Sequence, residues 1–244
     1  MIKTFAQILI SVLISVLLCA CSKSSVSSEA AASSYMLLNV GDVRQLVYQN
    51  DSSTVRWNIV GTTKRKDGTD VFIGQYIPGT EPPDTAYYFL RDGYFLSTLL
   101  DTSANWGYNP TNPYWEQKLA RLYPTNGEQW HIIVGENDST SFVAAHFQEK
   151  KVLCGNFLDV YGFTYTYYSN GMLDTMLTPF YAPNIGFIGT DINRDLQPDV
   201  SASYLKVGGR EMGSLWPAKN PSPAGTNAER IRRNRILRSI FGIR

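Results

Sequence analysis

Hydrophobic and polar residues alternate in short runs over most of the chain between residues 43 and 209, and these runs are rich in Tyr, Phe, Trp, Val, Ile and Thr. A period of two in residues of this type is typical of β-strands with one buried face. The pattern predicts strands at residues 43–49, 54–63, 70–77, 128–134, 141–148 and 202–209, hairpins at 85–100 and 156–178, and a strand-rich piece at 180–192.

Dipeptides typical of tight turns interrupt this pattern at Asp67-Gly68, Asp92-Gly93 and Asn170-Gly171. Such pairs between alternating runs indicate hairpin turns, because Asn, Asp and Gly tolerate the positive φ that these turns require. About ten strands joined in sequence by short turns predict a mostly β fold built on a single antiparallel sheet. Within it Phe163, Tyr165 and Tyr167 should share one face, opposite Thr164, Thr166 and Tyr168.

Two segments depart from the strand pattern and predict one or two short helices. Residues 112–124 have apolar side chains at helical spacing, at Trp115, Leu119 and Leu122. Near the carboxyl end, Thr226 and Glu229 have the spacing of a capping box ahead of a helix.

The amino terminus has the organisation of an export signal. Lys3 precedes an apolar run that is shorter than the ~20 residues a helix needs to cross a bilayer, which favours a signal peptide over a membrane anchor. The run ends in Leu18-Cys19-Ala20-Cys21, which resembles the lipobox of bacterial lipoproteins. The resemblance implies that residues 1–20 are removed and that Cys21 is acylated.

Residues 21–34 are rich in Ser and Ala and predict a flexible tether behind the lipid. Position 22 is Ser, whereas Asp there retains such lipoproteins at the inner membrane, so the resemblance implies an anchor in the outer membrane with the protein facing the periplasm. Several acyl chains hold firmly, because each buried CH₂ adds about 0.8 kcal/mol. Cys154 would be the single thiol besides Cys21, which excludes a disulfide framework.

The charges divide the rest of the chain into an acidic body, residues 35–217, and a tail, residues 218–244, that begins with a Pro/Gly-rich linker. From Ala228 on there are six arginines and one glutamate, net +5, whereas residues 21–227 carry 15 Lys and Arg against 20 Asp and Glu, net −5. An amphipathic Arg-rich helix predicts binding to anionic lipid or to an acidic partner, and docking on the chain's own acidic surface is the alternative. The arginines concerned are Arg230, Arg232, Arg233, Arg235 and Arg238. Nucleic acid is not expected as a partner outside the cytoplasm.

Catalytic and metal-binding motifs are weak. If residue 134 faces residue 141, His131 and His146 lie diagonally on one face, but zinc requires three or four ligands and none is near in sequence. Residues 191–199 have the Asp and Asn spacing of a calcium loop, yet Leu196 and Ala202 stand where Gly and Glu are needed. No G-x-S-x-G or phosphate-binding glycine pattern is present, so we expect a non-enzyme without metal or cofactor.

Aromatic residues are the remaining candidates for binding. They cluster in the strands predicted around residues 85–100 and 161–168, where they are able to line an apolar surface or to form ordinary core and cross-strand pairs. The residues selected as a ligand-binding lining are Tyr87, Phe89, Tyr94, Tyr161, Phe163, Tyr165 and Tyr167.

The segment "FYAPNIGFIGTD" (180–191) resembles the "YAPGVGxVK" motif near the end of many uncharacterised bacterial secreted proteins and lipoproteins, with a "YP...G..W" segment upstream at residues 123–130. It departs from that motif at Asn184 and Gly189. These proteins are similar to the lipoprotein-localisation-factor carriers. The resemblance implies a strongly curved antiparallel sheet, a half-barrel whose concave face holds acyl chains.

The function expected is therefore non-catalytic: an envelope lipoprotein that binds an apolar or lipid-like ligand in the concave face, or that has a structural role. An adaptor that works through the basic tail is the alternative. A hydrolase that uses His131 or His146 is a third reading, which no motif supports.

Metabolic labelling with a fatty-acid probe tests the lipid anchor. Replacing Cys21→Ser should abolish labelling and leave the unprocessed precursor in the cell. The matched variant Cys19→Ser should be labelled like the wild type, because Cys19 is discarded with the signal. Labelling of the Cys21→Ser protein would contradict the assignment.

Overall fold

The computed structural model describes residues 34–101, 114–133, 139–220, 238 and 240–242. The chain divides into two units, Met1–Ala32 and Ser33–Arg244, and all described residues belong to the second. Cys21 and the tether up to residue 33 lie outside the described residues, as do Arg230, Arg232, Arg233 and Arg235. The described part contains no helix that is both long and apolar enough to span a membrane.

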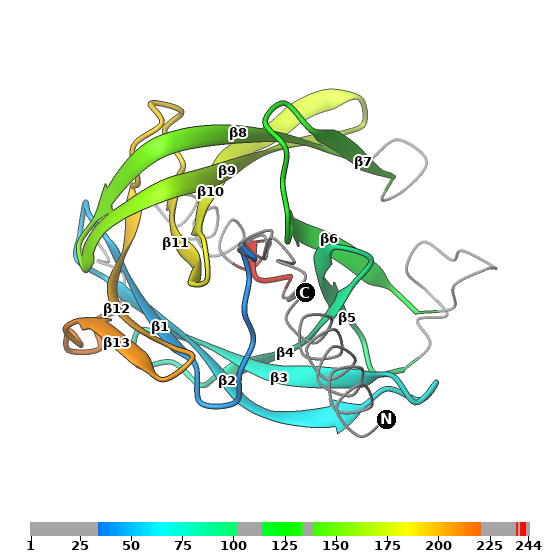
Figure 1. Cartoon of the computed structure of the whole chain (residues 1–244), viewed down its shortest axis with the longest axis horizontal. Coiled ribbons are helices and arrows are strands. Elements are labelled where there is room, and N and C mark those ends of the chain that lie inside the picture. Colours follow the sequence, from blue (N-terminus) through cyan, green and yellow to red (C-terminus); the bar gives the residue numbers. More distant parts are fainter. Residues whose placement is uncertain (1–33, 102–113, 134–138, 221–237, 239, 243–244) are drawn as a thin grey trace, which may run out of the picture. The chain divides into compact units, whose positions relative to one another are not determined.

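Thirteen strands in the described residues form one antiparallel sheet (Figure 1). They are β1 (Val43–Tyr48), β2 (Thr54–Lys64), β3 (Asp70–Pro78), β4 (Asp84–Arg91), β5 (Tyr94–Thr98), β6 (Glu116–Arg121), β7 (Gln129–Ile133), β8 (Ser139–Val152), β9 (Gly155–Ser169), β10 (Met172–Ala182), β11 (Gly186–Asp191), β12 (Val200–Val207) and β13 (Arg210–Gly213). The mostly β, single-sheet prediction is confirmed, with more strands than the ten or so expected.

The sheet consists of two meanders joined in the middle. One runs from β1 to β6, the other runs back from β12 to β7, and β1 pairs with β12 at the junction. β13 adds a short hairpin to β12. Among the described strands, β6 and β7 end the sheet and do not pair with each other, so the sheet is open. Figure 1 shows that it is strongly curved, as the resemblance implied.

Register shifts occur in several strand pairs of this curved sheet, at Gln45/Leu46, Ile59/Gly61, Phe95/Leu96, Leu173/Thr175 and Phe180/Tyr181. Bulges of this kind bend a strand and increase its twist, which allows a wide sheet to curl. The turns predicted at Asp92-Gly93 and Asn170-Gly171 have positive φ at both residues, as two-residue hairpins require. Asn184, which replaces Gly in the "YAPGVG" motif, also has a positive φ of 59°.

The helix expected at residues 112–124 is wrong where the structure describes it. Glu116–Arg121 forms strand β6, which pairs with β5. The register shift opposite Phe95 and Leu96 makes Leu119 an extra residue, so that Leu119 and Ala120 are both buried. This bulge interrupts the strict alternation of β6, and the apolar spacing that results imitates a helix. Outside the strands, Arg238 and Ile240 are helical among the described residues.

Aromatic side chains bridge the two ends of the sheet. The Tyr165 hydroxyl of β9 donates to the Leu119 carbonyl of β6. The rings of Tyr94 on β5 and Trp130 on β7 are 6.0 Å apart and edge-on. These contacts join one buried cluster that extends through most of the sheet, so the core does not depend on closure of the strands.

Gly74 in β3 provides a test of how tightly this core is packed. A Cβ on Gly74 would overlap the Tyr88 ring and lie 3.1 Å from Trp57 Nε1, whereas one on Gly61 of β2 would meet a single atom, at 3.8 Å. Gly74→Ala should therefore lower the free energy of unfolding by about 1–3 kcal/mol, the usual cost of overpacking. Urea denaturation measures it, with Gly61→Ala as the control that stays within about 0.5 kcal/mol. Equal effects of the two substitutions would contradict this packing.

Candidate functional site

Three residues on neighbouring strands form a row on one face of the sheet. Arg44 of β1 faces Trp57 of β2, and Trp57 faces Tyr76 of β3. Directly facing residues project from the same side of a sheet, about 5 Å apart, so these side chains lie next to one another. All three are buried, and Trp57 and Arg44 are fully inaccessible. The row ends on β4 at Asp84, which faces Tyr76.

The chain's own carboxyl end lies along this row. We call Arg238 and Ile240–Gly242 the C-terminal segment; Figure 1 shows it within the curve of the sheet. The Phe241 ring is 5.2 Å from Trp57, 5.7 Å from Tyr76 and 5.3 Å from Phe187 of β11. Ile240 and Phe241 are 1% and 2% exposed, so residues remote from the sheet in sequence form part of its core.

Two hydroxyl groups fix the backbone of the C-terminal segment. The Tyr88 hydroxyl of β4 donates to the Phe241 carbonyl over 2.6 Å, and Ser97 Oγ of β5 donates to the Gly242 carbonyl over 2.9 Å. Tyr88 and Ser97 face each other across the β4–β5 pair. Burial strongly raises the pKa of Tyr88, so its hydroxyl remains a donor at neutral pH. The segment is thus held by specific polar contacts as well as by aromatic packing.

An ion pair holds the start of the segment. Arg238 Nη1 lies 2.8 Å from Asp84 Oδ2, and both side chains are about one third exposed. A pair with this exposure contributes at most about 1 kcal/mol, less than the burial of Phe241. The burial of Phe241 therefore contributes more to holding the segment than this ion pair does.

The guanidinium of Arg44 is only partly satisfied. Its Nη2 donates to the Ile185 carbonyl over 2.7 Å and to the Leu37 carbonyl over 3.4 Å, and its Cζ lies 4.7 Å above the Trp57 ring. Its Nε and Nη1 have no hydrogen-bond partner in the described part of the chain. Burial lowers the pKa of Arg44 to about 10, so the side chain remains cationic at neutral pH.

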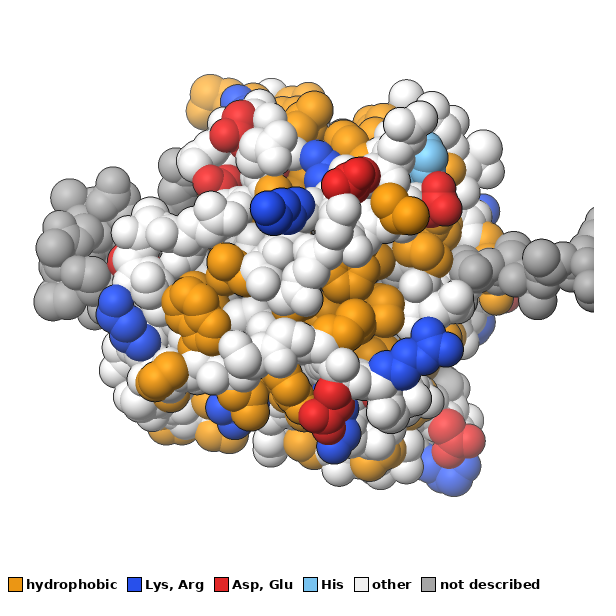
Figure 2. Space-filling model, turned by 60° about the vertical axis from the view of Figure 1, so that its left-hand side comes forward, with side chains coloured by type: hydrophobic (Ala, Val, Ile, Leu, Met, Phe, Trp, Pro, Cys, Tyr) orange, Lys and Arg blue, Asp and Glu red, His pale blue; other side chains and the backbone are white. Residues whose placement is uncertain are grey.

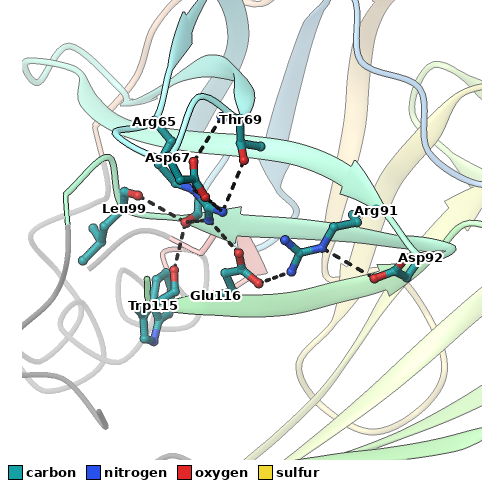
Figure 3. A network of polar contacts seen from close by, with 9 residues as sticks. Arg65, Asp67, Thr69, Arg91, Asp92, Leu99, Trp115 and Glu116 are labelled. Carbon is teal, nitrogen blue, oxygen red and sulfur yellow. Dashed lines mark hydrogen bonds and ion pairs between the residues drawn. The ribbon is translucent and has the colours of Figure 1, made fainter. Parts of the chain in front are cut away.

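A second buried arginine, Arg65, shows what a satisfied guanidinium looks like in this fold (Figure 3). Its Nη1 donates to Glu116 over 2.6 Å and to Thr98 over 3.1 Å, and its Nε donates to Asp67 over 3.0 Å. Glu116 also pairs with Arg91. Burial by itself lowers the pKa of Arg65, but the bonds to Asp67 and Glu116 raise it overall. Every nitrogen of the Arg65 guanidinium has an acceptor, and the network links the end of β2 with β5 and β6. Its role is therefore structural.

The aromatic lining predicted from the sequence is divided between two places. Phe163 and Tyr165 belong to the main core, as the alternation in β9 predicted. Tyr87 and Phe89 belong to a separate small cluster with Val71 and Leu96. Neighbouring residues in a strand point to opposite faces, so Tyr87 and Phe89 lie on the other side of β4 from Tyr88.

The remaining aromatic candidates lie at the edges of these clusters. Tyr94 packs against both clusters. The Tyr161 ring contacts Tyr35 at 5.1 Å and His146 at 5.2 Å, and Tyr167 is half-buried. A binding role for any of the seven stays a prediction. The residues that hold Phe241 were not selected from the sequence, since nothing in the strand pattern shows where a distant segment docks.

The two histidines do not come together. His131 faces Ser141 rather than residue 144, so the register assumed for a shared site is wrong. His146 is five residues further along β8, roughly 17 Å away at ~3.4 Å per residue and on the opposite face. His146 instead lies 3.5 Å from Asp159.

The Asp-rich loop of residues 191–199 satisfies its own carboxylates. Asp191 accepts from the amides of Arg194 and Leu196, and Asp199 accepts from those of Ile192 and Asn193. No cluster of three or more potential metal ligands occurs in the described part of the chain.

Cys154 is half-buried, its amide donates to Ala202, and burial raises the pKa of its thiol to about 11. A thiol with a raised pKa remains protonated and is a poor nucleophile. This environment is typical of a cysteine that contributes to packing.

Several large apolar side chains are exposed on β8–β10: Val143, Leu158, Tyr168, Met172 and Leu173. Figure 2 shows that apolar groups on one face of the molecule are interspersed with charged and polar ones. Tyr168 and Leu173 face each other beside the β9–β10 turn, whereas Val143 and Leu158 lie further along β8 and β9. Exposed apolar residues are common on protein surfaces and do not by themselves define a site.

The hydrogen bond from the Tyr88 hydroxyl to the Phe241 carbonyl should contribute measurably to the stability of the protein. Tyr88→Phe leaves a buried carbonyl without its donor, and it should lower the free energy of unfolding by about 1–3 kcal/mol. Tyr168→Phe, on an exposed tyrosine of β9, serves as the control and should stay within about 0.5 kcal/mol. Urea denaturation of the full chain measures both, and a Tyr88→Phe protein as stable as the wild type would contradict the contact.

Comparison of the chain with protein-family models, curated proteins and solved structures finds no match in any of the three. The function is therefore argued from the arrangement itself. The row packs against the Phe241 ring, and Tyr88 and Ser97 hold the carbonyls of the C-terminal segment. At one end of the row lies Arg44, a buried cation with unused donors.

Proposed function

We propose that this protein is a non-catalytic lipoprotein of the bacterial cell envelope that binds the apolar part of a ligand on the buried face of its curved sheet. In this proposal acylated Cys21 anchors it in the outer membrane, facing the periplasm. The observation that carries the binding role is the site in which Phe241 is buried. There Trp57, Tyr76 and Phe187 contact an apolar side chain from a segment that is not held in place by strand pairing.

A ligand with an alkyl chain is able to compete with the Phe241 side chain for this site. Burying one Phe side chain contributes about 1.5–3 kcal/mol, and each buried CH₂ about 0.8 kcal/mol. Roughly four CH₂ groups therefore equal the contribution of Phe241, and a longer chain exceeds it. The alkyl chain would bind to the surface of Trp57 and Tyr76 that Phe241 covers. Ligand binding and release of the C-terminal segment are therefore coupled.

The adaptor role of the basic tail has less support. Ile240 and Phe241 would belong to the apolar face of a membrane-bound helix, but both are buried in the core. Arg238 pairs with Asp84. Binding through these residues would first have to withdraw them from the sheet, which costs the burial of two large side chains.

Replacing Phe241→Ala in the full chain tests the proposal. It removes the side chain that competes with the ligand, so the affinity for the fluorescent apolar probe N-phenyl-1-naphthylamine should rise roughly tenfold or more. Leu158→Ala, at a side chain that is 62% exposed, is the control and should leave probe binding unchanged.

The same substitution should lower the free energy of unfolding by about 3–5 kcal/mol, the usual effect of truncating a buried Phe. If this prevents folding, Phe241→Leu retains more of the packing and should show a smaller rise in affinity. A folded Phe241→Ala protein that binds the probe no better than the wild type would refute the binding role.

A further inference from the structure

We propose that Arg44 is an anion-recognition residue, and that the ligand is an amphiphile with an anionic head group, a carboxylate or a phosphate, on an apolar chain. The proposal deepens the binding function above and rests on it. In this proposal the alkyl chain of the ligand occupies the site of the Phe241 side chain, and the head group binds the unused donors of Arg44.

Arg44 and Phe241 lie against the same side chain, that of Trp57. Arg44 faces Trp57 across the β1–β2 pair, and its guanidinium carbon lies 4.7 Å from the centre of that ring. The Phe241 ring lies 5.2 Å from the same indole. Arg44 and Phe241 therefore both lie against the Trp57 indole. The proposal requires that an alkyl chain in place of Phe241 extends along the row past this indole, so that its end reaches the guanidinium.

The guanidinium of Arg44 also has unused hydrogen-bond donors. Arg44 is fully buried, yet Nε and Nη1 have no partner in the described part of the chain. No ion pair of Arg44 occurs there either. Asp42 is near enough for its charge to raise the pKa of Arg44, but its carboxylate oxygens accept from the amides of Asn39 and Gly208. An unpaired buried charge is costly, and natural proteins retain one mainly where it has a partner or a task.

The contrast with Arg65 shows that this fold is able to satisfy a buried arginine. The bonds of Arg65 to Asp67, Thr98 and Glu116 engage its Nε and both terminal nitrogens. Within the described residues, Arg44 has two carbonyl partners, both on Nη2. The difference points to a missing acceptor at Arg44, and an anionic oxygen is the strongest acceptor for a guanidinium.

The surroundings select an amphiphile over a free inorganic anion. Arg44 has no exposed surface, and the Trp57 ring covers one side of its guanidinium. An inorganic anion would lose its hydration there without burying any apolar surface in return. An anion carried on an alkyl chain offsets that loss by the burial of its CH₂ groups.

Isothermal titration of the full-length Phe241→Ala protein with dodecanoate, dodecan-1-ol and inorganic phosphate tests the assignment. Dodecanoate should bind roughly tenfold or more tightly than the alcohol, which has the same chain and no charge, and phosphate alone should not bind. Dodecyl phosphate extends the comparison to the second head group. Adding Arg44→Met should reduce the affinity for dodecanoate to that of the alcohol while binding of the alcohol is kept.

Arg210→Met, at an exposed arginine of the β12–β13 hairpin, is the control and should leave the preference for dodecanoate intact. If Arg44→Met fails to fold, Arg44→Lys keeps the charge and should keep part of the preference. Equal affinity for dodecanoate and the alcohol would overturn the anion site and leave the apolar site standing. Absence of binding by both probes would overturn the proposed function as well.

Discussion

The antiparallel pairing of β1 with β12 is the interaction on which the rest of the structure depends. It joins two meanders, each connected by local turns, into one sheet that is wide enough to curl. The strands concerned are separated by about 150 residues, so their pairing carries a large loop-closure cost that local turns do not. Burial of the aromatic core offsets this cost, because only the joined sheet brings Trp57 of β2 and Phe187 of β11 to the same site.

The candidate site follows from this junction. Arg44 belongs to β1 and contacts the carbonyl of Ile185, next to β11, so the residue proposed for anion recognition also links the two meanders. Phe241 contacts Trp57 and Tyr76 from one meander and Phe187 from the other. A ligand that replaces Phe241 would take over the same bridging role, which explains how binding on this face is compatible with a stable sheet.

The sequence is informative where structure is local. The turns at Asp92-Gly93 and Asn170-Gly171 were predictable because few residues tolerate positive φ, and the buried face of β9 was predictable from alternation. The helix at 112–124 was wrong because a bulge at Leu119 breaks that alternation. The register predicted for β7 on β8 was also wrong, because the length of a loop alone does not determine which residues face each other.

The site was less predictable than the fold, for a physical reason. Tyr87, Tyr88 and Phe89 have similar hydrophobicity, and alternation alone does not tell which side of β4 faces the main core. The docking of Phe241 on Trp57 and Tyr76 joins residues more than 150 positions apart. Apolar helix-like spacing near the carboxyl end is equally compatible with a membrane surface. The unused donors of Arg44 become visible only once every neighbouring acceptor has a position.

Hydrogen exchange of the full-length protein with and without dodecanoate shows whether the ligand and the C-terminal segment occupy the same site. Saturating dodecanoate should raise the exchange rate of the amides of Ile240, Phe241 and Gly242, because the ligand takes their place, while amides of β1 to β3 remain protected. Unchanged protection of the C-terminal segment in the presence of bound dodecanoate would contradict a shared site.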